Sequence, residues 1–508
     1  MFDGLILLGQ GIAHFFTPWG LFNVAWATLL GLVIGVLPGL TASMGVALLV
    51  TLTYKMAPDQ AILTLMCVYL GAIYGGSRTA ILLNIPGTPA NAAATLDGHP
   101  LALQGKAGLA MGLATTSSTL GTIIGIIALA IIAPFLAEFA LRFGSWEFFW
   151  LALFGVIISG QMTNSDSPLK GYMAGILGLL VAMVGMESLH AHQRFTFGIP
   201  ALGGGVDLIP AMVGAFGLAE ILSVLKRKAV GRVIPVNDRV IPRLKEIFQY
   251  WRTIIRSGTI GTFVGIIPGV GEDIGAWTSY AAAKRASKNP DEFGKGSQEG
   301  LIAAETGDNA VVPAAMIPTL TLALPGSAAA AVLIAAMLIH GIRPGPMLMV
   351  ENAVFLYQVV AMLLFATIAN LIYGLSLTKL FIKVLQVPQE RLMGVIYVLC
   401  VVGSFAITQR MFDVYVMLFF GICGFILREL KFPMAPLVLG IVLGDLLDIN
   451  LRRGLQLTQG DPTPFFTRPI SMVLWVVILL VILMSIPAVN RRVRSLFANR
   501  KPRPSDAA

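Results

Sequence analysis

"GVLPGLTASMG" occupies residues 35–45, and "GIIPGVGEDIG" occupies residues 265–275. Both stretches place Gly-x-x-Pro-Gly inside a strongly apolar segment, with another glycine six residues after the central one. Proline and glycine are poor residues for the interior of a helix, because proline lacks the amide hydrogen and glycine loses the most backbone freedom. The sequence therefore predicts that a helical chain is interrupted twice, in nearly the same way.

The composition indicates a helical membrane protein with many spans. Of the 508 residues, 56% are hydrophobic and 12% are charged, whereas a soluble globular protein carries about 25% charged residues. Apolar runs such as "GTIIGIIALAIIAPFLAEF" recur along the chain, and several approach the roughly 20 residues that span a bilayer. They do not alternate apolar and polar residues as a transmembrane barrel would. We therefore expect an all-α polytopic membrane protein.

Basic residues are concentrated in two places. Nine of the 35 Lys and Arg residues fall between Lys226 and Arg256, and six more fall between Arg491 and Arg503. Each cluster adjoins a hydrophobic span, so nucleic-acid binding explains them poorly, whereas the positive-inside rule places both in the cytoplasm. Residues 238–258 mix basic and apolar positions and form either an amphipathic helix on the inner leaflet or an ordinary loop.

A second Pro-Gly pair follows each of the opening stretches. "AILLNIPGTPANAAA" (80–94) follows the first stretch and "LTLALPGSAAAAV" (320–332) follows the second. Matched halves of this kind are a common feature of transporters. The predicted organisation is an N-terminal segment at 1–20, transmembrane repeat 1 at 21–225, the basic cytoplasmic linker at 226–256, transmembrane repeat 2 at 257–450, a loop at 451–469, a final transmembrane helix at 470–487 and a basic cytoplasmic tail at 488–508.

The two repeats are expected to have opposite topology. With the linker and the tail inside and one final span before the tail, repeat 2 starts inside and ends outside, which requires an odd number of crossings. Arg452, Arg453 and Arg468 then lie outside, against the charge rule. The apolar arms around each first Pro-Gly, at 23–37 and 41–54 and at 257–267 and 274–283, are about half a bilayer long. We therefore expect one re-entrant hairpin and one broken transmembrane helix in each repeat, plus the extra terminal span.

Backbone freed at such breaks survives in a membrane only where protein or a wet cavity surrounds it. There its amides and carbonyls, with nearby hydroxyls and amide side chains, can bind an anionic substrate and a cation. The predicted substrate-binding residues are Thr41, Ser43, Asn84, Pro86, Gly87, Thr88, Asn91, Pro325, Gly326 and Ser327. For each of these residues, helix capping or hydrogen bonding between helices is the alternative.

Acidic residues in the second repeat indicate cation coupling, because an ionisable side chain inside a membrane is expensive. The predicted cation-coupling residues are Pro38, Gly39, Gly269, Gly271, Asp273, Asp308 and Asn309. Glu272 and Glu305 raise the same question, and a solvated turn is the alternative for the tip acids. Arg78 and Arg343 are further candidates for pairing with substrate carboxylates, although a helix-end position suits Arg343 better.

Three long motifs resemble the large membrane subunit of the tripartite tricarboxylate transporters, the TctA family. They are "GVLPGLTASMGVALLVTLTYKMAPDQAI", "YGGSRTAILLNIPGTPANAAATLDGHPLALQGKAG" and "GIIPGVGEDIGAWTSYAAAKRASKNPDEFGKGSQEGLIAAETGDNA". The resemblance implies secondary active uptake of citrate-like carboxylates across a bacterial inner membrane, driven by a sodium or proton gradient. It implies two partners, a small TctB-like membrane subunit and a periplasmic TctC-like solute-binding protein. By looser analogy with elevator-type symporters, it suggests an elevator mechanism.

Two other functions are weighed against a transporter. An intramembrane enzyme could use Asp273 and Asp308 as an acid pair, but the counterpart of Asp273 in repeat 1 is Ser43. An anion channel would need no matched breaks. No metalloprotease, Cys-x-x-Cys or phosphate-loop motif is present. We therefore expect no enzyme activity, no cofactor, and no metal apart from a coupling sodium ion.

Overall fold

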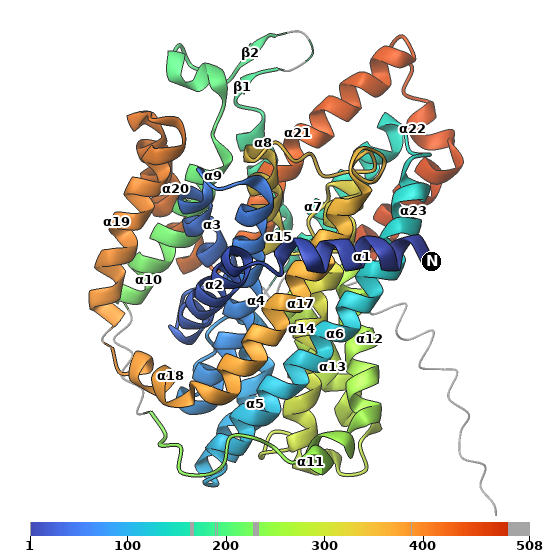
Figure 1. The fold of residues 1–508 in the computed structure, drawn as a ribbon. Coiled ribbons are helices and arrows are strands. Elements are labelled where there is room, and N and C mark those ends of the chain that lie inside the picture. The colour runs from blue at the N-terminus through green and yellow to red at the C-terminus, as the bar shows by residue number, and fades with distance from the viewer. Residues whose placement is uncertain are drawn as a thin grey trace, which may run out of the picture.

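The computed structural model describes residues 2–162, 167–187, 189, 191–226, 233–387 and 389–485. This part of the chain is almost entirely helical, and its β-structure is one small antiparallel pair (Figure 1). Seven of its helices are long and apolar enough to cross a membrane. The prediction of an all-α polytopic membrane protein is therefore confirmed.

The helices follow one another with short connections. In chain order they are α1 (Phe2–Phe15), α2 (Pro18–Val36), α3 (Ala42–Thr53), α4 (Pro58–Leu83), α5 (Ala92–Leu103), α6 (Ala107–Ala140), α7 (Ser145–Met162), α8 (Pro168–Ala182), α9 (Leu208–Met212), α10 (Ala219–Lys226), α11 (Leu244–Phe248), α12 (Trp251–Ile266), α13 (Glu272–Ala286), α14 (Gln298–Leu322), α15 (Ala328–Ile339), α16 (Leu348–Glu351), α17 (Ala353–Ser376), α18 (Thr378–Leu385), α19 (Gln389–Thr408), α20 (Met411–Glu429), α21 (Met434–Leu457), α22 (Pro464–Thr467) and α23 (Pro469–Ser485).

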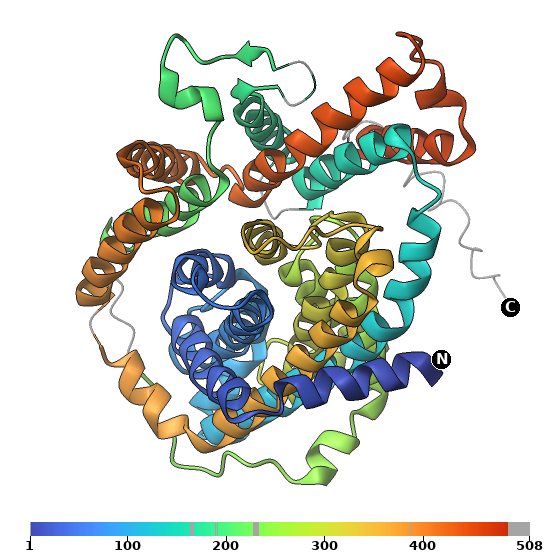
Figure 2. The ribbon, with the colours of Figure 1, turned by 45° about the horizontal axis from the view of Figure 1, so that its top comes forward.

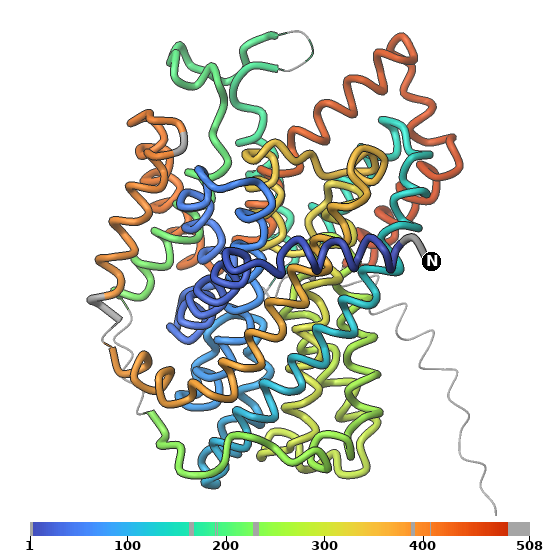
Figure 3. The backbone as a smooth tube through the Cα atoms, in the orientation of Figure 1, coloured from blue at the N-terminus to red at the C-terminus, as the bar shows by residue number. Residues whose placement is uncertain are grey.

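Short elements complete the chain. Three single turns of 3₁₀-helix are η1 (Pro89–Asn91), η2 (Pro200–Gly204) and η4 (Pro290–Glu292), and a π-helical turn, η3 (Val213–Leu218), joins α9 to α10. Strands β1 (Gly185–Met186) and β2 (Gln193–Arg194) form a small hairpin. This hairpin lies at one end of the molecule, and α11 with the linker around it lies at the other (Figures 1 and 3).

Glycines let the first helix of each predicted hairpin pack closely on the long helix that follows. In the first half, Gly31 and Gly35 of α2 meet the backbone of α4, and Gly71 and Gly75 of α4 meet the backbone of α2. A Cβ at Gly71 would lie 2.8 Å from the Thr28 carbonyl oxygen. Small residues allow backbones to approach where lipid offers no hydrophobic drive for association.

The second half repeats this packing between α12 and α14. Gly261 of α12 lies against the backbone of Gly307, and Gly265 lies against Val311 and Ala314. In both halves the contacting residue numbers rise together along the two helices, so each pair of helices is parallel. The two halves therefore share the same close helix packing, with glycines at corresponding positions.

The outer helices of each half of the chain pack against helices of the other half. Helices α7 and α8 pack against α21, whereas α20 packs against η3 and α10. The long helices α6 and α17 pack against each other and against the central helices. Figure 2 shows α2–α4 and the α12–α15 region at the centre, with the α19–α20 group and the α7–α8–α21 group outside them.

Helices occupy the segments predicted as hairpin arms and as the final transmembrane helix. The predicted arms contain α2 with α3 and α12 with α13, and the predicted final helix contains α23, a shorter apolar helix of 17 residues. The segment 238–258 is not one helix, because only α11 forms before α12 begins, and Pro242 lacks the amide hydrogen that a helix continuing through it would need. The predicted tail at 488–508 lies outside the described residues.

Gly35→Ala is expected to destabilise the protein, because the added methyl group would overlap the carbonyl oxygen of Ala72. Overpacking of this kind costs about 1–3 kcal/mol. The thermal unfolding midpoint of the purified chain measures the effect. Gly9→Ala is the matched control, since nothing lies within 4 Å of its added Cβ and alanine is the better helix former. An equal midpoint for the two variants would contradict this packing.

Candidate functional site

The two first Pro-Gly pairs form turns of the same geometry. Helix α2 ends before Leu37 and α12 ends before Ile267, and both of these residues are extended, with φ/ψ of −83°/114° and −78°/118°. Gly39 and Gly269 then adopt left-handed backbone, with φ of 90° and 76°, which glycine adopts readily. We call residues 37–41 tip 1 and residues 267–271 tip 2.

The two second Pro-Gly pairs also match each other. Helix α4 ends at the left-handed Asn84 (φ 57°) and α14 ends at the left-handed Ala323 (φ 56°). Each is followed by an extended segment that doubles back along its own helix, so that Gly87 lies against Gly76 and Gly326 lies against Ala315. We call residues 84–91 break 1 and residues 323–327 break 2. Both predicted interruptions are therefore present.

Tip 2 rests on break 2, and break 1 rests on the end of α2 just before tip 1. The amide of Gly269 donates to the Pro325 carbonyl (2.9 Å), and the amide of Gly271 donates to the Gly326 carbonyl (3.1 Å). In the first half, Gly87 is so close to the Gly35 carbonyl oxygen that a side chain there would overlap it. The polar backbone exposed by one interruption is thus partly satisfied by the other, as buried amides and carbonyls require.

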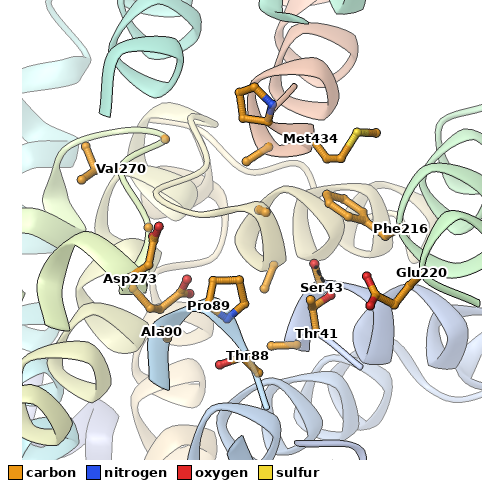
Figure 4. Close-up of a pocket in the computed structure, with 18 of the residues that line it drawn as sticks. Thr41, Ser43, Thr88, Pro89, Ala90, Phe216, Glu220, Val270, Asp273 and Met434 are labelled. Atoms are coloured by element: carbon orange, nitrogen blue, oxygen red, sulfur yellow. Dashed lines mark hydrogen bonds between the residues drawn. The ribbon is translucent and has the colours of Figure 1, made fainter. Parts of the chain in front are cut away.

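Both tips, break 1 and the start of α15, which follows break 2, contribute to one cavity of about 680 Å³ (Figure 4). Six of the predicted residues line it: Thr41, Ser43, Thr88, Gly269, Gly271 and Asp273. The other predicted residues do not line it: Pro38, Gly39, Asn84, Pro86, Gly87, Asn91, Pro325, Gly326, Ser327, Asp308 and Asn309. Ser327 nevertheless caps α15, whose first residues Ala328 and Ala329 are part of the wall.

Three helices begin at this cavity. Ala42 and Ser43 open α3, Glu272 and Asp273 open α13, and Ala328 opens α15. The Thr41 hydroxyl accepts from the Met44 amide (3.2 Å), which caps α3. The amino-terminal ends of helices carry a partial positive charge and spare amide donors, so their convergence suits an anion.

The far wall of the cavity comes from residues that the sequence analysis did not single out. It contains Phe216 of η3, Glu220 of α10, Arg428 of α20, Lys431 and the segment 432–435. Arg428 and Glu220 form an ion pair, and a Cβ at Gly39 of tip 1 would lie 2.8 Å from Oε1 of Glu220. In the sequence, the charges in "FILRELKFP" (425–433) were the available signal for this wall. Such charges are common at the ends of helices, so they did not indicate a binding site.

Tyr69 connects the two halves behind the cavity. Its hydroxyl donates to the Glu272 carboxylate beside tip 2 and lies 2.9 Å from the Ser327 hydroxyl of break 2. Tyr69 belongs to α4 and is fully buried. The first half of the chain therefore holds the acidic start of α13 in place.

Asp308 and Asn309 lie in a separate, fully buried group within α14. The side chain of Asn91 in break 1 donates to Ser77 (3.2 Å) and to Asp308 (3.4 Å). Asn91 also accepts from the Thr88 hydroxyl (2.6 Å). The predicted acid pair of an enzyme is not assembled, because Asp273 lines the cavity and Asp308 does not.

Neither predicted arginine lines the cavity. Arg78 is buried, and it donates to the Tyr74 carbonyl and to the Thr115 hydroxyl (2.7 Å). Arg343 is exposed beyond the end of α15, which agrees with a helix-end position. The basic groups at the cavity are Arg428 and Lys431 instead.

Comparisons with known proteins bear on most of the chain. The model of the tripartite tricarboxylate transporter TctA family matches residues 21–439. An Agrobacterium vitis protein described as an uncharacterized 52.8 kDa protein in the TAR-I ttuC' 3' region is 34% identical over 484 residues, covering 93% of this chain and 94% of that protein. A second Agrobacterium vitis protein, from the TAR-II ttuC' 3' region, is 34% identical over 238 residues, covering 47% of this chain and 98% of that protein. No solved structure matches.

Tyr69→Phe is expected to loosen tip 2, because it removes the hydroxyl shared by Glu272 and Ser327. A hydrogen bond to a charged group contributes about 1.5–3 kcal/mol, so the amides of residues 269–271 should exchange with deuterium roughly ten-fold faster or more. Hydrogen–deuterium exchange with mass spectrometry measures this.

Tyr74→Phe is the control for that experiment. It removes an equally buried hydroxyl from the same helix, one that bonds to Thr122 (3.2 Å) and not to either tip. Unchanged exchange at tip 2 in Tyr69→Phe, or an equal increase in both variants, would contradict the role given to Tyr69.

Proposed function

We propose that this chain, which belongs to the tripartite tricarboxylate transporter TctA family, carries its carboxylate substrate through the cavity between the two tips. The family consists of transporters and not of enzymes, so the chain is a tricarboxylate transporter subunit and a multi-pass membrane protein. The proposal concerns the route of the substrate, its coupling and its partners.

The convergence of three helix amino termini on one cavity is the observation that carries the proposal. Helices α3, α13 and α15 all begin there, and each offers positive dipole and amide donors to an anion. The hydroxyls of Thr41, Ser43 and Thr88 add donors, and Lys431 adds a positive charge. A volume of about 680 Å³ falls in the range of small-molecule sites.

Charge is unevenly distributed around this cavity, which suggests where the substrate carboxylates lie. Glu272 and Asp273 make the start of α13 acidic, whereas the starts of α3 and α15 carry no acid in their first turns. We therefore place the carboxylates near Thr41, Ser43 and Thr88, facing Lys431. Pro86, Gly87, Pro325, Gly326 and Ser327 then shape the walls without contacting the substrate.

We further propose that the two halves are inverted repeats, each with a re-entrant hairpin. Ser77 of α4 bonds to Glu305, whereas Tyr69, about two turns earlier in α4, reaches Ser327 beside the later part of α14. Helices α4 and α14 therefore run in opposite directions, which is the relation that inverted repeats require. The end of the molecule that carries α11 and the basic linker is then cytoplasmic.

An elevator-type mechanism is the form of alternating access that we propose. The tips, the breaks and their supporting helices form a central body, and η3, α10, α20 and the start of α21 face it across the cavity. Movement of the body past this outer wall would expose the cavity to each side in turn. A sodium or proton gradient would drive the cycle in the bacterial inner membrane.

The family name supports two partners that we also propose. The large subunit of a tripartite system requires a small TctB-like membrane subunit and a periplasmic TctC-like solute-binding protein. The binding protein would deliver the carboxylate at the end of the molecule that carries β1 and β2. Citrate is the probe of choice for a tricarboxylate transporter.

Uptake of labelled citrate into proteoliposomes that contain the chain with both partners tests the proposal. An inward sodium or proton gradient should raise accumulation, and Lys431→Gln should raise the KM for citrate about ten-fold, since a charged contact contributes about 1.5 kcal/mol.

Lys379→Gln is the control, because Lys379 is exposed on α18 and does not line the cavity. Accumulation that neither gradient changes would contradict coupled transport. An unchanged KM in Lys431→Gln would contradict the proposed position of the substrate.

A further inference from the structure

A buried group of polar side chains lies beside the cavity but is not part of its wall. It consists of residues from α4, break 1, α6 and α14, and we call it the acid cluster: Ser77, Asn91, Ser118, Glu305, Asp308 and Asn309. Each of these side chains is at most 1% exposed. Ionisable groups buried in this way inside a membrane protein are costly and call for a partner.

The hydrogen-bond donors in the acid cluster are too few for its acceptors. The hydroxyls of Ser77 and Ser118 both donate to the same oxygen, Oε2 of Glu305, at 2.6 and 2.9 Å. The Asn309 amide nitrogen is shared among the Asp308 carboxylate (2.6 Å), Ser118 (2.9 Å) and the Glu305 carbonyl (3.0 Å). Among the described residues, Oε1 of Glu305 and Oδ1 of Asn309 have no hydrogen-bond partner.

Negative charge in the acid cluster exceeds the positive charge beside it. Among the described residues no salt bridge forms with Glu305 or Asp308. Arg78 attracts Glu305 electrostatically but donates to Tyr74 and Thr115, so one guanidinium stands against two carboxylates. Two carboxylates with unsatisfied oxygens, in a place that water does not reach, form an environment that attracts a cation. Oxygen atoms of carboxylates, amides and hydroxyls are the ligands that hard cations prefer.

We propose that the acid cluster binds the sodium ion that drives transport, and that Oε1 of Glu305, Oδ1 of Asn309 and the Asp308 carboxylate are its ligands. This inference rests on the proposed transport function and places the coupling ion within α14. It moves the ion away from tip 1, tip 2 and Asp273, which lines the open cavity instead. Glu305 joins Asp308 and Asn309 as a coupling residue.

A short path connects the acid cluster to the substrate cavity. Asn91 bonds to Ser77 and Asp308 in the cluster, and it accepts from the hydroxyl of Thr88, which lines the cavity. The single turn η1 holds Thr88 and Asn91 three residues apart. An ion that orders Asp308 and Asn91 therefore also orders Thr88 for the substrate, which gives the two ligands a positive coupling.

Thermal unfolding of the purified full-length chain in lipid nanodiscs tests this site without transport. Choline chloride is replaced by sodium chloride or potassium chloride at constant ionic strength and pH 8. Sodium should raise the unfolding midpoint of the wild-type chain in a saturable way, because a ligand that binds only the folded state stabilises it. Glu305→Gln and Asp308→Asn should each weaken the apparent sodium affinity at least about ten-fold.

Two further variants keep the test decisive. Asp273→Asn removes an acid at tip 2 and should leave the sodium response unchanged. Ser118→Ala is a mild change that should weaken the response even if the acid variants do not fold. A wild-type chain that responds equally to sodium, potassium and choline would overturn the proposal. So would a folded Glu305→Gln or Ser118→Ala variant with full sodium affinity, or a response that only Asp273→Asn abolishes.

Citrate is titrated into the same samples to separate this inference from the proposed function. A sodium response that needs the acid cluster, without any citrate response, would support the ion site and contradict the substrate cavity. A citrate response that is lost in Lys431→Gln, without any sodium response, would support the substrate cavity and contradict the ion site. Sodium should tighten citrate binding in the wild-type chain but not in Asp308→Asn.

Discussion

Polar backbone that leaves a helix inside a membrane must find partners in the protein, because lipid offers none. The helices of this chain are interrupted at two tips and two breaks. The interrupted segments lie near one another, so that polar backbone groups of one segment bond to another. The amides of Gly269 and Gly271 bond to the carbonyls of Pro325 and Gly326, and Gly87 lies against Gly35 and Gly76. The glycine contacts of α2 with α4 and of α12 with α14 bring these segments close together, and both tips and break 1 contribute residues to the cavity.

The two halves share the backbone geometry of their tips and breaks but differ in side-chain chemistry. Ser43 and Asp273 begin corresponding helices, as do Thr88 and Ser327 at the two breaks. The hydroxyls of the first half offer donors to an anion. At the corresponding helix starts, the acids belong to the second half, at Glu272 and Asp273 of α13. Glu305 and Asp308 of that half are buried within α14. A similar backbone with different side chains would thus suit the anion site and the cation site that we propose.

The sequence predicted the interruptions well because proline and glycine act locally on the backbone. It located both tips, both breaks and the hairpin arms to within a few residues. It could not predict which side chains would meet, since that depends on contacts between distant segments. Glu220 with Arg428 and Tyr69 with Glu272 are pairs about 200 residues apart. Arg78 was misleading for the same reason, because only the fold places Thr115 and the Tyr74 carbonyl within reach of its guanidinium.

Coupling between an ion and a substrate requires that each ligand alter a group that the other one contacts. In the coupling that we propose, Asn91 would meet this condition, because its amide nitrogen reaches Asp308 and Ser77 while its oxygen accepts from Thr88. The carboxamide group of asparagine is planar, so a rotation that moves its nitrogen also moves its oxygen. Gly76 adds a steric limit, since a side chain there would overlap the Asn91 oxygen. If the proposed sites hold, linkage requires that an anion that orders Thr88 favour the cation as much as the cation favours the anion.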